Sequence, residues 1–122
     1  MNKRILVIED TEDNRQIIRD LLTSFDYELL EAVDGAEGVA KAETHRPDLI
    51  LMDIQLPVID GYEATRRIRA IPELARVPIV AVTSYALSGD EAKTREAGCD
   101  GYIAKPFSPR QLLAKVREFL PD

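Results

Sequence analysis

Short apolar runs alternate with segments of helical periodicity along the whole chain. Three runs of strand length, Arg4–Ile8, Leu49–Asp53 and Ile79–Thr83, are apolar almost throughout and meet a polar residue at or just after their last position. Such runs are typical of parallel strands that are covered on both faces of a sheet. Residues 28–33 and Gly101–Ala104 form two further candidate strands. Residues 28–33 are less apolar, so we expect them at an edge of the sheet.

A helical period follows each candidate strand. After the first strand, Ile17, Ile18, Leu21, Leu22 and Phe25 recur at helical spacing and predict one buried stripe. Further helices are predicted to begin near residues 34, 61, 88 and 109. Five consecutive strand–helix units predict one α/β domain over residues 1–122, with a parallel sheet, helices on both faces and right-handed crossovers.

The predicted fourth helix, residues 88–97, has a thin apolar stripe. Ala92 and Ala97 are its inward candidates among charged and polar neighbours. A helix that buries so little apolar surface has low local stability and moves easily. We therefore expect this helix to be the adjustable element of the fold.

The composition is that of an acidic globular protein. The chain has 122 residues, of which 45% are hydrophobic and 31% charged, and its formal net charge is -6. This charge disfavours nucleic acid and anionic membranes as direct partners. The single Cys99 excludes an intramolecular disulfide, and no apolar run is long enough to span a bilayer, so we expect a cytoplasmic protein. Arg66, Arg67 and Arg69 are interpreted as the solvated face of the third helix.

Charged residues follow three of the candidate strands. Glu9 and Asp10 come after the first strand, Asp53 ends the third and Lys105 follows the fifth. Because the carboxyl ends of parallel strands meet at one edge of a sheet, these side chains should converge. Three crowded carboxylates repel one another, and a hard dication such as Mg²⁺ would hold them all ionised. The lysine suggests that the site receives a phosphoryl group.

Short motifs around these residues carry a resemblance that covers the whole chain. In this order, and at the ends of the expected strands, they resemble a response regulator receiver domain of the CheY-like superfamily. The resemblance is strongest to cell-division-type single-domain (DivK-like) receivers, although chemotaxis-type receivers share the same site residues. The motifs are Glu9-Asp10, Leu51-Met52-Asp53, Leu56-Pro57, Asp60-Gly61, Ala81-Val82-Thr83-Ser84 and Tyr102-Ile103-Ala104-Lys105-Pro106.

The resemblance implies a flavodoxin-like (βα)5 three-layer sandwich with strand order 2-1-3-4-5, and it makes Asp53 the phosphoacceptor. A histidine kinase or a histidine phosphotransfer protein would supply the phosphoryl group. A carboxylate suits this role because it is ionised near neutral pH and needs no general base. The resemblance also implies a cis bond before Pro106 that directs Lys105 inward. The chain would catalyse only its own phosphorylation and dephosphorylation and would otherwise not be an enzyme.

A metal site is also implied by the resemblance. Asp10 and Asp53 would bind Mg²⁺ directly, with Mn²⁺ as a possible substitute, and the backbone carbonyl of Gln55 would complete the protein ligands. Glu9 would act through a water molecule. All of these ligand atoms are oxygens, as Mg²⁺ prefers.

The resemblance also implies residues for the conformational switch on phosphorylation and for the lifetime of the phosphorylated state. Thr83 would hydrogen-bond the phosphoryl group and Tyr102 would change rotamer with it, so that the face of the fourth helix, fifth strand and fifth helix signals to a downstream protein. The positions of Gln55 and Tyr85 would tune dephosphorylation, and Tyr85 would slow it by shielding the acyl phosphate. No effector domain follows, so we expect output through a protein contact by a monomer or a phosphorylation-dependent dimer.

Two enzyme classes with related sites are disfavoured. A haloacid-dehalogenase-type phosphatase would need a second aspartate where Gln55 stands, because that residue protonates the leaving group. A flavodoxin-type flavin binder would need a hydroxyl- and glycine-rich loop after the first strand, whereas this loop contains Glu9, Asp10, Glu12 and Asp13. A receiver domain excised from a larger hybrid kinase or multidomain regulator stays open as an alternative.

Overall fold

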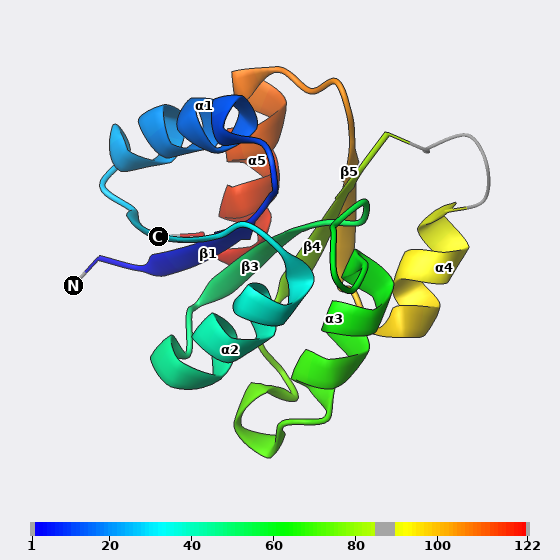
Figure 1. The fold of residues 1–122 in the computed structure, drawn as a ribbon. Helices are drawn as coiled ribbons and strands as arrows, with labels where there is room; N and C mark the ends of the chain where they lie inside the picture. Colours follow the sequence, from blue (N-terminus) through cyan, green and yellow to red (C-terminus); the bar gives the residue numbers. More distant parts are fainter. Residues whose placement is uncertain (1, 85–89, 122) are drawn as a thin grey trace.

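A parallel β-sheet runs through the centre of the molecule (Figure 1). The structure is a computed structural model that describes residues 2–84 and 90–121. Within these ranges the chain forms β1 (Arg4–Ile8), α1 (Glu12–Thr23), β2 (Glu28–Ala32), α2 (Gly35–His45), β3 (Leu49–Asp53), α3 (Gly61–Arg69), a 3-10 turn (Pro72–Leu74), β4 (Ile79–Thr83), α4 (Asp90–Ala97), β5 (Gly101–Ala104) and α5 (Pro109–Phe119).

The strand order confirms the predicted topology. Among the described residues, five strands pair in parallel in the order β2-β1-β3-β4-β5, which is the flavodoxin-like arrangement. β2 lies at an edge as expected, and it ends at Ala32, one residue earlier than predicted. The inner strands β3 and β4 are buried at every position, which explains their continuous apolar sequences.

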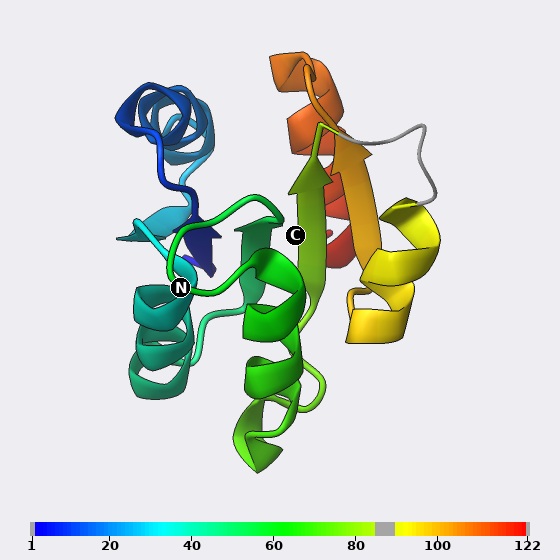
Figure 2. The same cartoon turned by 45° about the vertical axis from the view of Figure 1, so that its right-hand side comes forward.

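Two helix layers cover the sheet (Figures 1 and 2). Ile5 and Val7 of β1 share a core with residues of α1 and α5, whereas Leu6 and Ile8 share a core with residues of α2 and α3. This alternation follows from the two-residue period of a strand. Each central strand therefore contributes to both cores, and its carboxyl end is left to carry polar groups.

The apolar stripe predicted for α1 is only partly correct. Ile18 and Leu22 are buried, but Ile17 is 56% exposed. Ile17 precedes Ile18 by 100° of helix rotation and faces the flank of α1 instead of the sheet. Phe25 is also exposed because α1 ends at Thr23, and the guanidinium of Arg117 lies 5.2 Å from the centroid of its ring.

The inward residues of α4 differ from the prediction. Ala97 is buried, but Ala92 is exposed and Thr94 takes the inward position. Thr94 and Ala97 are three residues apart and therefore share a face, whereas Ala92 points away from it. The Thr94 hydroxyl is accommodated because it donates a hydrogen bond to the carbonyl oxygen of Glu91 at 2.7 Å.

Arg69 is not part of a solvated face, which corrects the prediction for α3. Its side chain is only 18% exposed and donates hydrogen bonds to the carbonyl oxygens of Gly98 (2.9 Å) and Val77 (2.6 Å). It also pairs with Asp100 Oδ2 at 2.5 Å, and that oxygen accepts the backbone N–H of Ile79 at 2.9 Å. One side chain thus ties the end of α3 to the start of β4 and to the turn before β5.

We predict that Arg69→Met lowers the free energy of unfolding by about 2–3 kcal/mol, because it leaves several partly buried acceptors without their donor. The matched control is Arg67→Met, since Arg67 lies on the same helix, is 53% exposed and pairs locally with Glu63. The control should change stability by no more than about 0.5 kcal/mol. Urea denaturation measures both values, and equal losses would contradict the structural role of Arg69.

Candidate functional site at the carboxyl ends of the strands

The ends of β1, β3 and β5 bring together residues that are far apart in the sequence. Ile8 of β1 pairs with Met52 of β3, so Glu9, directly after β1, lies at the same level as Asp53, the last residue of β3. Lys105 follows β5, which is separated from β3 by β4, and its ammonium contacts both carboxylates. The predicted convergence of these side chains is therefore present in the structure.

Lys105 forms ion pairs with two buried carboxylates. Its Nζ atom lies 3.0 Å from Glu9 Oε1 and 3.0 Å from Asp53 Oδ2. Glu9 is 3% exposed and Asp53 is 4% exposed. Burial by itself lowers the pKa of the Lys105 ammonium, but the hydrogen bonds and charges of Asp53 and Glu9 outweigh burial and raise this pKa above its ordinary value. The lysine is therefore a fixed positive charge beside Asp53.

The second oxygen of each buried carboxylate is bound by the backbone. Glu9 Oε2 accepts the N–H of Thr11 at 3.0 Å, and Asp53 Oδ1 accepts the N–H of Gln55 at 3.0 Å. In both cases the N–H donor lies two residues after the acid, so each carboxylate stabilises the turn that begins the loop after its own strand. This arrangement fixes both carboxylates before any ligand binds.

Asp10 adds an exposed carboxylate to the two buried ones. One oxygen atom from each of Glu9, Asp10 and Asp53 can be chosen so that all three lie within 4.8 Å of one another. Desolvation raises the pKa of Asp10, and the hydrogen bond and negative charge of Glu9 raise it further. A cluster of oxygen ligands with excess negative charge fits a small hard dication, and the exposed Asp10 leaves an open approach.

Thr83 and Tyr102 lie on the same face of the sheet. Thr83 is fully buried and pairs in register with Ala104, while Tyr102 is half-buried and pairs with Ala81. Side chains at alternate strand positions share a face, so Thr83, Ala81 and Tyr102 project to one side. The small Ala81 lies at the level of Tyr102, two residues before Thr83 on β4.

The remaining predicted site residues are placed as follows. The peptide bond between Lys105 and Pro106 is cis, and the N–H of Lys105 donates to the carbonyl oxygen of Thr83 at 2.7 Å. Gln55 is exposed in the loop after β3. Tyr85, which is expected to shield the acyl phosphate, lies outside the described residues.

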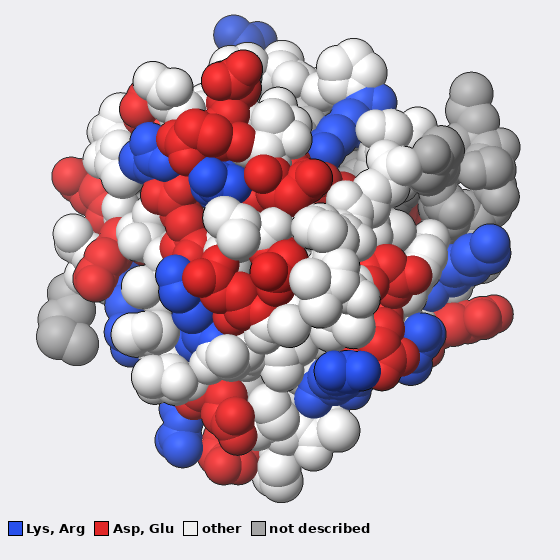
Figure 3. All heavy atoms as spheres, in the orientation of Figure 1, with Lys and Arg blue, Asp and Glu red and all other residues white. Residues whose placement is uncertain are grey.

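Acidic and basic side chains are interspersed over the face of α1, α2 and α3, with patches of acidic residues between them (Figure 3). The cluster of Glu9, Asp10 and Asp53 belongs to a molecule of net charge -6. Such a field favours cations over free anions at long range. In the part of the chain that the structure describes, no helix is long and apolar enough to cross a membrane.

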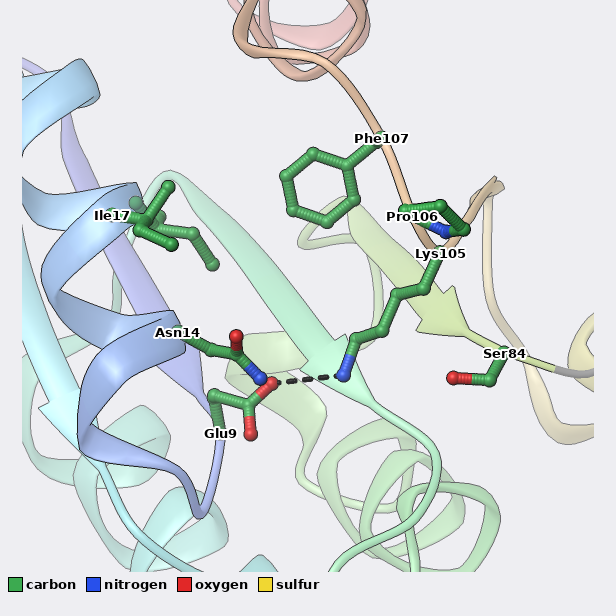
Figure 4. Close-up of a pocket in the computed structure, with 8 residues that line it drawn as sticks. Glu9, Asn14, Ile17, Ser84, Lys105, Pro106 and Phe107 are labelled. Carbon is green, nitrogen blue, oxygen red and sulfur yellow. Dashed lines mark hydrogen bonds and ion pairs between the residues drawn. The ribbon is translucent and has the colours of Figure 1, made fainter.

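A pocket of about 480 Å³ opens beside the ion-paired lysine (Figure 4). Its polar floor contains Glu9 and Lys105, and its apolar walls come from α1 and from the segment after β5. Ile17 and Phe107 are wall residues that the sequence analysis did not identify as part of a site. Ile17 carries no separate signal in the sequence, because it shares the helical spacing of the residues expected in the core. The lining residues are Glu9, Asn14, Ile17, Ile18, Ser84, Lys105, Pro106 and Phe107.

Comparison with known proteins gives one consistent family. The sequence profile of the response regulator receiver domain matches residues 5–117. The polar-differentiation response regulator DivK of Brucella anthropi is 41% identical over 122 residues, covering 100% of this chain and 99% of that protein. DivK of Brucella ovis is 40% identical over the same length. These similarities confirm the family resemblance found in the sequence.

Solved structures show the same similarity. The receiver domain of sensor histidine kinase PA1611 from Pseudomonas aeruginosa superposes with a TM-score of 0.93 at 41% identity, with 100% of both chains covered. That structure has a magnesium ion coordinated in the active-site cleft. Chemotaxis protein CheY4 of Vibrio cholerae has a TM-score of 0.92 at 28% identity, covering 98% of this chain and 99% of that one.

We predict that Asp10→Asn stabilises the metal-free protein at neutral pH. The raised pKa of Asp10 means that the folded protein holds this proton more tightly than the unfolded chain does. The resulting stabilisation is complete at low pH and is lost as pH rises through the raised pKa. The advantage of the variant should therefore grow from acid to neutral pH, and it should stay below about 1 kcal/mol because Asp10 is exposed.

Urea denaturation in the presence of a chelator measures this difference across the pH range. Asp20→Asn is the control, because Asp20 is an exposed acid of α1 outside the carboxylate cluster. A variant at Asp10 that is less stable than the wild type at every pH would show that the carboxylate cluster is not under electrostatic strain.

Proposed function

The chain belongs to the response regulator receiver domain family, and from this premise we propose that Asp53 accepts a phosphoryl group from a phosphohistidine. The family is one of two-component signalling domains, which accept a phosphoryl group as a signal and are not enzymes in the ordinary sense. The observation that carries the proposal is the Lys105 ammonium 3.0 Å from Asp53 Oδ2, beside the acidic pair of Glu9 and Asp10. Few other functions require a buried nucleophile beside a fixed positive charge.

Asp10, Asp53 and the backbone carbonyl of Gln55 would hold Mg²⁺, or Mn²⁺ in its place, with Glu9 acting through a water molecule. The dication would supply neutralisation of negative charge on the phosphoryl oxygens. The oxygen-only donor set and the magnesium in the cleft of the PA1611 receiver domain support this assignment. The exposed position of Asp10 supports entry of the ion from solvent.

In the transfer, a carboxylate oxygen of Asp53 forms a new bond to phosphorus as the bond between phosphorus and the donor imidazole nitrogen breaks. The electron pair of the broken bond stays with the imidazole. Lys105 balances charge on the phosphoryl oxygens and keeps the acyl phosphate oriented. Because its ammonium is already in place, little reorganisation is needed during the step.

The switch proposed from the sequence uses Thr83 and Tyr102. The hydroxyl of Thr83 would donate to the new phosphoryl group, and the space beside the small Ala81 would let the Tyr102 ring turn inward. Tyr102 lines a groove of about 220 Å³ with residues of α4 and α5, including Thr94 and Lys115. A change of its rotamer would therefore alter the α4-β5-α5 face, which we propose as the surface that contacts the downstream protein.

Two residues, Gln55 and Tyr85, are proposed to set the rate of dephosphorylation. Gln55 is exposed beside Asp53 and can influence how water reaches the acyl phosphate. Tyr85 is proposed to slow this hydrolysis by shielding, from a position outside the described residues.

The phosphodonor, a histidine kinase or a histidine phosphotransfer protein, would dock over the pocket beside Lys105. Exposed Ile17 and half-buried Phe107 offer apolar contacts at its walls, and Lys105 lies at its floor. An apolar helix surface around the donor histidine fits these walls and places its phosphoryl group at Asp53.

The relatives support two biological settings. The DivK relatives are polar-differentiation response regulators, so we propose a cytoplasmic single-domain receiver in bacterial cell-cycle signalling, acting as a monomer or a phosphorylation-dependent dimer. The PA1611 relative is the receiver domain of a sensor histidine kinase, which supports the alternative of a domain from a larger hybrid kinase or multidomain regulator. The proposed chemistry at Asp53 is the same in both settings.

We predict that acetyl phosphate with Mg²⁺ adds one phosphoryl group to the wild type and none to Asp53→Asn. Lys105→Met should lower the rate of phosphorylation by about 100-fold, because it removes one pre-positioned charge from the transition state. Mass spectrometry of the intact protein measures both effects. Lys115→Met, on α5 and outside the carboxylate cluster, is the control and should react like the wild type. An adduct on the Asp53 variant would refute the assignment of the nucleophile.

We further predict that Ile17→Asp slows phosphoryl transfer from a phosphorylated histidine phosphotransfer protein by about 10-fold or more, since it places a charge in the apolar docking surface. Its reaction with acetyl phosphate should be unchanged, because this small donor does not use that surface. Val33→Asp is the matched control, as Val33 is an exposed apolar residue that does not line the pocket. Equal rates for all three proteins with the protein donor would place the docking surface elsewhere.

A further inference from the structure

We propose that Arg15 is a positioning residue that fixes the loop bearing Glu9 and Asp10 and so sets the affinity of the site for Mg²⁺. The inference rests on the magnesium site proposed above. It concerns a residue of α1 that does not itself belong to the carboxylate cluster.

The Arg15 side chain is only 10% exposed and contacts three separate segments. One guanidinium nitrogen donates to the carbonyl oxygen of Glu9 at 2.8 Å. A second nitrogen lies 2.5 Å from Glu12 Oε2, and Nε lies 3.3 Å from Glu31 Oε1 of β2. The guanidinium thus joins the first turn of α1 and an adjacent strand to the loop after β1.

The carbonyl of Glu9 belongs to the peptide unit that leads into Asp10. A peptide unit is planar, so fixing its oxygen also fixes the direction in which the chain continues. The N–H of Glu9 is held by the carbonyl oxygen of Ala32 at 3.0 Å, and its side chain is held by Lys105. Arg15 adds a hydrogen bond to the Glu9 carbonyl oxygen. The chain leads from this carbonyl directly to Asp10, whose exposed carboxylate belongs to the cluster.

Charge alone predicts the opposite effect of Arg15. A guanidinium near the site should repel Mg²⁺, and its removal should then tighten metal binding. Glu12 and Glu31 contact the guanidinium and offset much of its charge. Their carboxyl pKa values are lowered, in both cases chiefly by hydrogen bonds from Arg19, so both acids remain ionised at neutral pH. We therefore expect the geometric effect of Arg15 to exceed its repulsion.

Arg19 provides a matched control. It lies one turn further along α1 and pairs with the same two acids, at 2.7 Å from Glu31 and 3.1 Å from Glu12. Arg19 contributes a similar charge and similar ion pairs, but the hydrogen bond to the Glu9 carbonyl comes from Arg15. The difference between the two arginines therefore isolates the contact with the loop.

The test is the dissociation constant of Mg²⁺, measured by calorimetric titration of the wild type, Arg15→Met, Arg15→Lys and Arg19→Met, with Asp10→Asn as the reference for a lost ligand. We expect Arg15→Met to weaken Mg²⁺ binding by about 10-fold, as is usual when a group that orients a metal ligand is removed. Arg15→Lys should recover part of this loss, because a lysine can still donate one hydrogen bond to the carbonyl. Arg19→Met should stay within about twofold of the wild type.

Different results identify which idea fails. Equal affinities for Arg15→Met and Arg19→Met, or tighter binding by Arg15→Met, would overturn the positioning role while leaving the magnesium site intact. If the wild type does not bind Mg²⁺, or Asp10→Asn binds it equally well, the proposed metal site fails and this inference fails with it. Thermal denaturation checks folding, and if Arg15→Met does not fold, Arg15→Lys decides: weaker binding than the wild type supports the role, and equal binding overturns it.

Discussion

The central constraint in this protein is the burial of two carboxylates beside one ammonium. Glu9 and Asp53 are almost fully buried, and Lys105 contacts both. A charged group buried this deeply is costly unless it has a partner of opposite charge and hydrogen bonds to its remaining lone pairs. The backbone N–H groups of Thr11 and Gln55 supply those bonds, so the chain holds both carboxylates in defined positions.

The parallel sheet makes this constraint possible. Its inner strands satisfy their own backbone groups and bury apolar side chains on both faces, so charged residues can gather only at the strand ends. The helices that pack on this sheet line different surface sites. α1 lines the pocket beside Lys105 through Ile17, while α4 and α5 line the groove beside Tyr102. The proposed docking surface for the phosphodonor and the proposed output surface are thus lined by different residues.

Much of this architecture could be predicted from the sequence, because a central strand is apolar at every position and a polar residue marks its end. The strand order required the family resemblance, since hydrophobic periodicity does not determine which strands are neighbours. The errors have two causes. Ile17, Ala92 and Thr94 were misjudged because the rotation of a helix about its axis depends on its neighbours. Arg69 was misjudged because its acceptors come from loops distant in sequence.

One main-chain hydrogen bond links the two ends of the proposed mechanism. The N–H of Lys105 donates to the carbonyl oxygen of Thr83. The residue proposed to neutralise charge and the residue proposed to bind the phosphoryl group are thus joined by one backbone hydrogen bond between β4 and β5. The backbone of Lys105 is therefore anchored to the end of β4, and a displacement of Thr83 would be passed to the residue that carries the ammonium.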